Sequence, residues 1–301
     1  MRRSYYEASA RQRIAGILDP DSFEEFLPPS ARVVSPHLHT LDLPVAFDDG
    51  VAVGRGRLSG HAVLIAAQEG GFMGGAVGEV QGAKIVGLLQ RAERERPAAV
   101  LLLVESGGVR LQEANAGLIA VSEVMRAILS ARVLGIPVVA AIGGQYGCFG
   151  GMGIAIPCCN AVVMSEQGRL GLSGPEVIES ARGVEEFDSR DRALVWRTVG
   201  GKHRYLLGDC SALVDDDTAT FRTALIAAVA GAQALTLEAV EREHVLLTQR
   251  LAAFGKLDDG MEVWRALGWS EPESVPLADT DVFLATAHSL ELDRMQAAGA
   301  R

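Results

Sequence analysis

The chain has 301 residues and a formal net charge of −10, and 49% of its residues are hydrophobic. This length suffices for one large domain with a deep core or for two small ones, and the acidity excludes nucleic acid as an expected partner because it would repel a phosphate backbone. No apolar run approaches the roughly 18 residues that span a bilayer, and charged sequence replaces a signal-peptide core, so we expect a cytoplasmic protein without a membrane span.

Residues 1–43 contain several prolines in polar sequence. We expect an N-terminal arm here, with short helices around residues 8–17 and 21–27, that packs over a neighbouring chain.

Four short apolar runs follow, at residues 62–67, 99–104, 137–142 and 161–164. Continuous apolar runs are typical of strands that are covered on both faces. Helical spacing separates the runs, with one face at Ile85, Leu88, Leu89 and Ala92 and another at Leu118, Val121, Met125 and Ile128. We predict an α/β domain over residues 44–234, with several loops gathered along one edge.

Residues 235–301 are predicted to form a C-terminal helical extension. Leu237, Val240, Leu247 and Leu251 form an apolar stripe within residues 236–254, and residues 282–297 show a second helical pattern. These helices cover either this chain or a partner.

The four cysteines are Cys148, Cys158, Cys159 and Cys210. They form no C-x-x-C pair, and no histidine lies at zinc-finger spacing. We therefore expect reduced, largely buried thiols, no disulfide framework and no bound metal.

Two glycine turns are the most informative feature of the sequence. Residues 106–110 read Ser-Gly-Gly-Val-Arg and residues 147–151 read Gly-Cys-Phe-Gly-Gly, and each turn follows an apolar run. Gly107 and Gly108 permit positive φ and close backbone approach, and we expect a helix to begin near Arg110. Gly150 precedes a second helix that we expect to begin at Gly151.

The backbone N–H groups of Val109 and Gly151 are the donors that this pattern predicts for an oxyanion hole, which stabilises charge developing on a carbonyl oxygen. The turns thus favour an enzyme acting on an activated acyl group. Each turn alone is equally explained as an ordinary strand-to-helix connection or as close helix packing.

The pairing of the turns resembles the crotonase superfamily. Residues 67–79, 84–86, 106–113 and 172–179 look like the carboxyltransferase β-subunit pattern of acetyl-CoA carboxylases, in a match that covers roughly residues 20–210. The chain departs from this carboxylase pattern in two ways. No cysteine precedes Cys148, whereas the bacterial carboxylase subunit usually begins with a zinc ribbon, and the sequence of the second turn differs from that of the carboxylases. With its length and C-terminal extension, the chain looks like the β subunit of biotin-independent malonate decarboxylase.

This resemblance implies a crotonase-like ββα superhelix and a subunit that works with a γ subunit. The substrate is implied to be a malonyl thioester, carried on an acyl carrier protein (the δ subunit) by a phosphoribosyl-dephospho-CoA arm. Loss of CO₂ leaves the acetyl thioester through an enolate. No cofactor is implied to bind this chain directly, and one chain supplies only half of the site.

Other residues are weaker candidates. Tyr146 is a possible contact for the arm or source of a proton, or simply a packed aromatic. Arg190 and Arg192 belong to a basic stretch, with Lys202 and His203, that either receives phosphates or the carrier protein or is a solvated face. Arg110 holds an anion or pairs with Glu113 on a helix surface.

Three other functions remain open. One is the carboxyltransferase β subunit of a biotin-dependent acyl-CoA carboxylase. A hydratase or isomerase of the crotonase class is disfavoured, because Gly153 and Ile154 occupy positions where a glutamate is common. The third is a non-catalytic scaffold.

Overall fold

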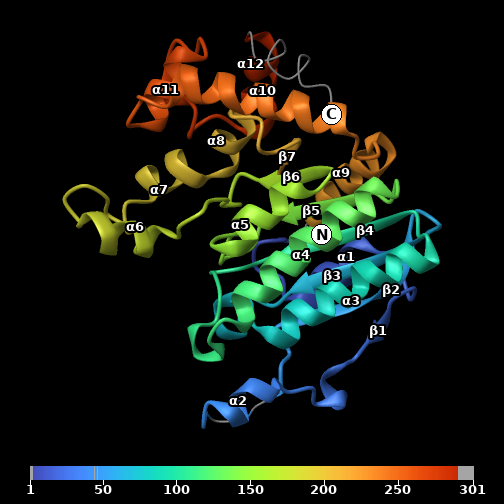
Figure 1. The fold of residues 1–301 in the computed structure, drawn as a ribbon. Helices are drawn as coiled ribbons and strands as arrows, with labels where there is room; N and C mark the ends of the chain where they lie inside the picture. The colour runs from blue at the N-terminus through green and yellow to red at the C-terminus, as the bar shows by residue number, and fades with distance from the viewer. Residues whose placement is uncertain (1–2, 44, 46, 291–301) are drawn as a thin grey trace.

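The structure is a computed structural model that describes residues 3–43, 45 and 47–290, and in that part of the chain it contains a seven-stranded sheet (Figure 1). The strands lie side by side in chain order. The first three are antiparallel neighbours, and β3 to β7 run parallel. The strands are β1 (Glu24–Phe26), β2 (Val51–Leu58), β3 (His61–Gln68), β4 (Ala99–Val104), β5 (Val138–Ile142), β6 (Ala161–Ser165) and β7 (Ala212–Val214).

Helices cover both faces of this sheet. On one face lie α3 (Glu79–Glu95) and α4 (Ala116–Val133), and on the other lie α1 (Ala10–Ile17) and α9 (Thr218–Gly231) (Figure 1). Alternate residues along each strand point to opposite faces of the sheet. Leu102 packs with the α3–α4 side and Leu101 with the α1–α9 side. The expectation of an α/β domain with strands buried on both faces is confirmed.

The remaining helices lie at the periphery of the sheet. A short helix, α5, follows β5, the pair α6 and α7 projects as an arm, and α10 to α12 form a separate layer at the β7 edge (Figure 1). Their bounds are α2 (Pro36–Thr40), α5 (Gly151–Ala155), α6 (Pro175–Arg182), α7 (Arg192–Val199), α8 (Gly201–Leu206), α10 (Leu237–Phe254), α11 (Gly260–Ala266) and α12 (Thr280–Ser289).

The N-terminal arm differs from expectation in two ways. The predicted helix at residues 21–27 is wrong, because Glu24–Phe26 forms the edge strand β1, where Glu24 lies opposite Arg55 and pairs with it at 2.7 Å. The backbone of β1 is hydrogen-bonded to β2 on one side, and its polar side chains can face water. The arm also packs on its own sheet, where α1 buries Ile14 and Ile17 against the α9 layer.

The C-terminal helices match the expected patterns in part. Helix α10 is present, but its predicted stripe faces solvent, with Leu237 and Leu251 more than two-thirds exposed and Leu246 buried instead. The stripe therefore does not cover the described part of this chain. Helix α12 ends at Ser289, and the residues from 291 to 297 in the last predicted helix lie outside the described residues.

The parallel strands determine where the glycine turns lie. Strands β4 and β5 are neighbours in parallel register, with Val104 opposite Ile142. Segments that follow neighbouring parallel strands leave the sheet at the same edge, which is where ligands bind in open α/β sheets. The two turns thus emerge next to each other.

Candidate active site

The first turn runs from the end of β4 through Gly107 and Gly108 to Val109. Gly107 donates its N–H to the carbonyl of Gly74 at 2.9 Å, and the carbonyl of Gly108 accepts from Val77 N–H at 2.8 Å. Gly108 has φ of +138°, a conformation that favours glycine. Within the described residues, the N–H of Val109 donates to no protein acceptor. It is thus available to a ligand.

The helix predicted to begin near Arg110 is only a single 3₁₀ turn, and the α-helix starts several residues later. Arg110 is extended, a 3₁₀ turn covers Leu111–Glu113, and α4 begins only at Ala116. The reason is burial: the Arg110 guanidinium is ion-paired with Asp48 and, at 3.0 Å, with Glu113, and all three side chains are buried. The pair with Glu113 exists, but it is interior rather than on a helix surface. These charges anchor the end of the first turn.

The second turn leads from β5 to α5. Gly150 has φ of +62°, donates its N–H to the carbonyl of Leu172 at 2.9 Å, and precedes Gly151, the first residue of α5. In the part of the chain that the structure covers, the N–H of Gly151 likewise has no protein acceptor. Behind it, Met152 and Ala155 are buried and fix the helix to the core.

The structure brings the two turns together. Ser106 N–H donates to Gly147 O at 2.8 Å, and Phe149 N–H donates to Ser106 O at 2.7 Å. A Cβ on Gly150 would lie 2.9 Å from the Cα of Gly108. Val109 and Gly151 each follow one of these touching glycines, so two unpaired amides are held by adjoining backbone.

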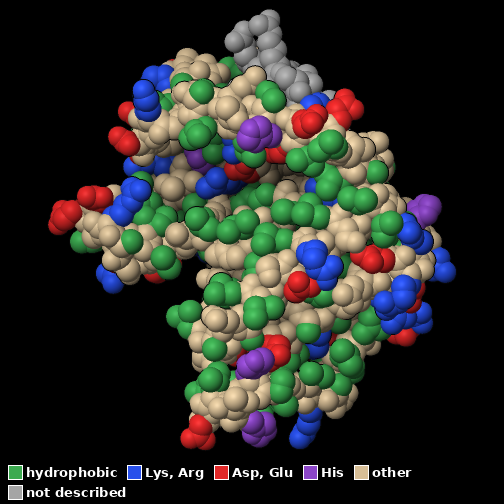
Figure 2. All heavy atoms as spheres, in the orientation of Figure 1, with side chains coloured by type: hydrophobic (Ala, Val, Ile, Leu, Met, Phe, Trp, Pro, Cys, Tyr) green, Lys and Arg blue, Asp and Glu red, His purple; other side chains and the backbone are tan. Residues whose placement is uncertain are grey.

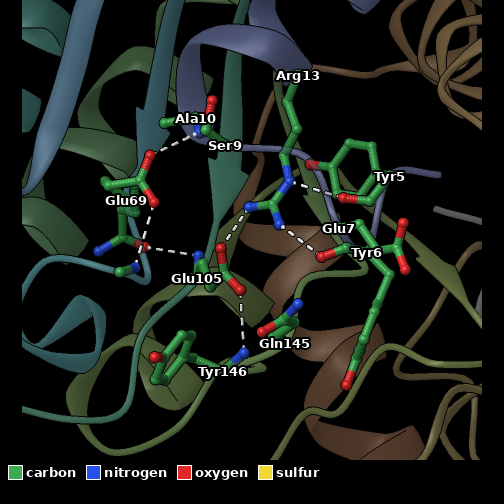
Figure 3. Close-up of polar contacts among 12 residues, drawn as sticks. Tyr5, Tyr6, Glu7, Ser9, Ala10, Arg13, Glu69, Glu105, Gln145 and Tyr146 are labelled. Atoms are coloured by element: carbon green, nitrogen blue, oxygen red, sulfur yellow. Dashed lines mark hydrogen bonds and ion pairs between the residues drawn. The ribbon is translucent and has the colours of Figure 1, made fainter. Parts of the chain in front are cut away.

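Tyr146 lies beside the second turn (Figure 3). Its N–H donates to Oε1 of Glu105 at 3.0 Å, and its ring packs against the loop at Gly70, where a Cβ would come within 2.4 Å of it. The side chain is 42% exposed. Tyr146 is therefore a packed aromatic that also has an open face.

Sequence reasoning missed Glu105 and its partner Arg13. Glu105 directly precedes the first turn, and Arg13 lies on α1, in the expected N-terminal arm. They form an ion pair of 2.5 Å in which both side chains are buried. An acidic residue between a buried strand and a glycine turn was the available signal.

The basic stretch is divided between surface and interior. Arg190 and Arg192 are exposed, and the Arg192 guanidinium lies 5.1 Å from the centre of the Trp196 ring, at a cavity of about 270 Å³. No described hydrogen bond or ion pair connects either arginine to the glycine turns. Lys202 and His203 are buried, so the solvated-face interpretation is wrong for them. Burial lowers the pKa of His203 to about 3.

The cysteines and the metal-ligand residue types add no further site. All four cysteines are free, and burial raises the thiol pKa of Cys148 and Cys159. The described residues hold no cluster of three or more metal-ligand side chains. No helix among them is long and apolar enough to cross a membrane.

The chain is similar to several known proteins. The Carboxyl transferase domain model matches residues 6–221. The malonyl-S-ACP:biotin-protein carboxyltransferase MADC of Malonomonas rubra is 40% identical over 96% of this chain and 97% of its own length. The methylmalonyl-CoA carboxyltransferase 12S subunit of Propionibacterium freudenreichii is 32% identical over 59% of this chain but only 33% of its own.

Solved structures show the same relationship. A chain of the Pseudomonas malonate decarboxylase hetero-tetramer in complex with malonate is 43% identical to this one, with a TM-score of 0.79. The match covers 88% of this chain and 97% of that one. This chain therefore belongs to the carboxyl transferase domain family, with the malonate decarboxylase subunits among its relatives.

Proposed function

We propose that this chain is the β subunit of a malonate decarboxylase, converting a malonyl thioester on an acyl carrier protein to the acetyl thioester and CO₂. The observation that carries the proposal is the pair of unpaired amides, Val109 and Gly151, on touching glycine turns. The name of the related Pseudomonas complex supports the choice of malonate as the acyl group.

The proposed chemistry follows from these two donors. As the bond between the carboxylate carbon and the α-carbon breaks, its electron pair moves into the thioester carbonyl and forms an enolate. Val109 and Gly151 donate hydrogen bonds to the enolate oxygen, whose charge is greater than in the ground state, so they favour the transition state. Gly108 and Gly150 turn the backbone so that these amides face the ligand. The enolate carbon then takes a proton.

The thioester arm is proposed to approach between the two segments that contain Gly107 and Tyr146. The phosphoribosyl-dephospho-CoA arm belongs to the substrate here, since it carries the malonyl group. Its phosphates, or the acidic carrier protein itself, are proposed to meet Arg190 and Arg192, whose guanidinium groups form no ion pair among the described residues. Charge reversal at both arginines should weaken carrier binding at low salt, and unchanged affinity would remove this part of the proposal.

The site is proposed to be completed by a γ subunit. Leu118 near the start of α4, Ile154 in α5 and Leu172, whose carbonyl accepts from Gly150, are exposed hydrophobic residues beside the two turns. Figure 2 shows a face that is hollowed beneath the α6–α7 arm. Exposed apolar groups that gather beside a site are typical of a protein interface. We expect the isolated chain to release little CO₂, and full activity without a partner would contradict the proposal.

The relative from Malonomonas rubra supports a second candidate, in which the carboxyl group passes from malonyl-S-ACP to a biotin protein as that relative's name states. Both reactions break the same bond and need the same oxyanion stabilisation. Avidin separates them: CO₂ release from malonyl-carrier by the reconstituted complex should be insensitive to avidin. Inhibition would favour the biotin acceptor.

Two further points belong to this proposal. The strand–turn–helix units are assigned to a ββα superhelix, supported by the family match. A cytoplasmic location is proposed with them, since free thiols suit a reducing compartment.

A further inference from the structure

Glu105 connects the two glycine turns through its side chain. Its main chain directly precedes Ser106 of the first turn, and its Oε1 accepts a hydrogen bond of 3.0 Å from the N–H of Tyr146 in the segment that leads to the second turn (Figure 3). One residue thereby links the segments that follow β4 and β5.

Arg13 holds the other carboxylate oxygen. Its Nη1 donates to Oε2 of Glu105 at 2.5 Å, and the side chains are only 1% and 4% exposed. The guanidinium is itself fixed, because its Nε donates to the carbonyl of Tyr5 at 2.9 Å and its Nη2 to that of Tyr6 at 3.3 Å. Glu105 is thus fixed by the N-terminal segment and α1.

The surrounding backbone leaves space for this carboxylate. A Cβ on Gly144 would lie 2.4 Å from Oε1 of Glu105 and 2.6 Å from Nη2 of Arg13. Only glycine fits at this position without displacing the ion pair. The chain entering the second turn is therefore in van der Waals contact with the carboxylate as well as hydrogen-bonded to it.

We propose that Glu105 is a positioning residue that fixes the spacing of the two oxyanion-hole amides, Val109 and Gly151. This inference rests on the proposed function. Glu105 acts through the backbone and not on the substrate, since both of its oxygens are already occupied by protein donors. A carboxylate is required because Arg13 and Tyr146 present N–H donors on two sides, and glutamine offers only one acceptor oxygen for them.

The test compares two isosteric variants in the complex with the partner subunit. Glu105→Gln leaves one donor facing an NH₂ group, whereas Glu25→Gln breaks the ion pair between Glu25 and Arg11 (2.7 Å). The control removes an ion pair of the same helix α1 that touches neither turn. We expect E105Q to lower kcat by at least about tenfold, with KM for malonyl-carrier within about threefold of wild type, and E25Q to keep wild-type kcat.

Hydrogen exchange supplies a readout that does not depend on turnover. Amides in residues 106–110 and 144–151 should exchange at least about tenfold faster in E105Q than in wild type or E25Q. Wild-type kcat in E105Q, or equal losses in E105Q and E25Q, would overturn the positioning role. A wild-type complex that releases no CO₂ would instead reject the proposed function, and exchange at the turns would still decide the role of Glu105.

A double variant separates the effect on folding stability from the effect on positioning. Arg13→Met leaves Glu105 as an unpaired buried charge, and adding Glu105→Gln removes that charge, so the double variant should unfold at higher urea than R13M alone. Its kcat should stay as low as that of E105Q. Recovery of kcat in the double variant would show that charge balance alone matters and would overturn the inference.

Discussion

Gly150 and Gly108 are in direct backbone contact, because a Cβ on Gly150 would lie 2.9 Å from the Cα of Gly108. The residue after each glycine carries one of the two candidate oxyanion donors. The distance between these donors therefore depends on a contact that admits no side chain. The contact between the turns is made by backbone atoms alone, and Glu105 positions the segments that carry it.

Substitution of Gly150 should lower turnover strongly without preventing assembly. Gly150→Ala places a methyl group against Gly108 at a positive φ, so the turns must separate and kcat should fall by about 10²- to 10³-fold, as on loss of an oxyanion donor. Gly87→Ala is the control, since Gly87 lies in α3 with open space around its Cβ position. Assembly is checked by co-purification with the partner, and unchanged kcat in G150A would favour a scaffold role.

The buried Arg110–Asp48 pair should contribute strongly to stability. Asp48→Ala leaves the guanidinium with Glu113 and the carbonyl of Ala76, and breaking a buried pair on one side costs about 3 kcal/mol of unfolding free energy. Glu95→Gln, which breaks the more exposed Arg91–Glu95 pair, should cost less than about 0.5 kcal/mol. Urea unfolding measures both, and similar losses would contradict the difference in burial.

His203 should make stability depend on pH. Its Nδ1 accepts a hydrogen bond from Trp264 Nε1–H at 3.1 Å, so the folded chain holds the imidazole neutral, and burial lowers its pKa to about 3. The unfolded chain binds a proton near pH 6.5, so between the two values it binds more protons and unfolding becomes easier as pH falls.

The expected contribution of His203 is full above about pH 6.5 and falls by about 1.4 kcal/mol per pH unit below it. His203→Gln keeps an acceptor for Trp264 and should flatten this part of the slope, measured by urea unfolding between about pH 5 and 7.5. His61→Gln, at an exposed position, should leave the slope as it is. Equal slopes in wild type and H203Q would contradict the prediction.

The exposed hydrophobic residues near the two glycine turns should bind the partner subunit. Leu118→Glu on α4 should weaken association by at least about tenfold, because a charge would be buried in the interface without a partner. Val133→Glu provides the comparison, since Val133 is equally exposed but lies at the far end of the same helix. Analytical ultracentrifugation of the mixed subunits measures the affinity, and equal effects would place the interface elsewhere.

The predictable part of the fold was its buried centre. The apolar runs that became β3, β4, β5 and β6 are covered on both faces, so hydrophobicity alone marks them. The strands β1, β2 and β7 were missed for physical reasons. Strand β2 alternates glycine and arginine near its end, and β1 and β7 are three-residue edge strands whose backbone pairing leaves little side-chain signal.

The candidate site also has a part that the sequence predicts and a part that it does not. Glycine spacing predicted which amides follow the turns, because backbone conformation is a local property. Glu105, Arg13 and Asp48 were not predictable, because their roles arise from pairs separated by 92 and 62 residues along the chain. The position of Glu105 before the first turn is a local signal, but no local pattern identifies the partners of these charges, which meet only after folding.

The order of the strands has a consequence for synthesis. Each strand from β2 to β7 pairs with the one before it, so the sheet can grow one strand at a time as the chain leaves the ribosome. The two glycine turns become neighbours once β5 has docked on β4, but Tyr5, which stacks on Phe221, lacks this cover until α9 has been made. Until then the nascent chain leaves that aromatic surface open, which makes this interval the one in which a chaperone would engage it.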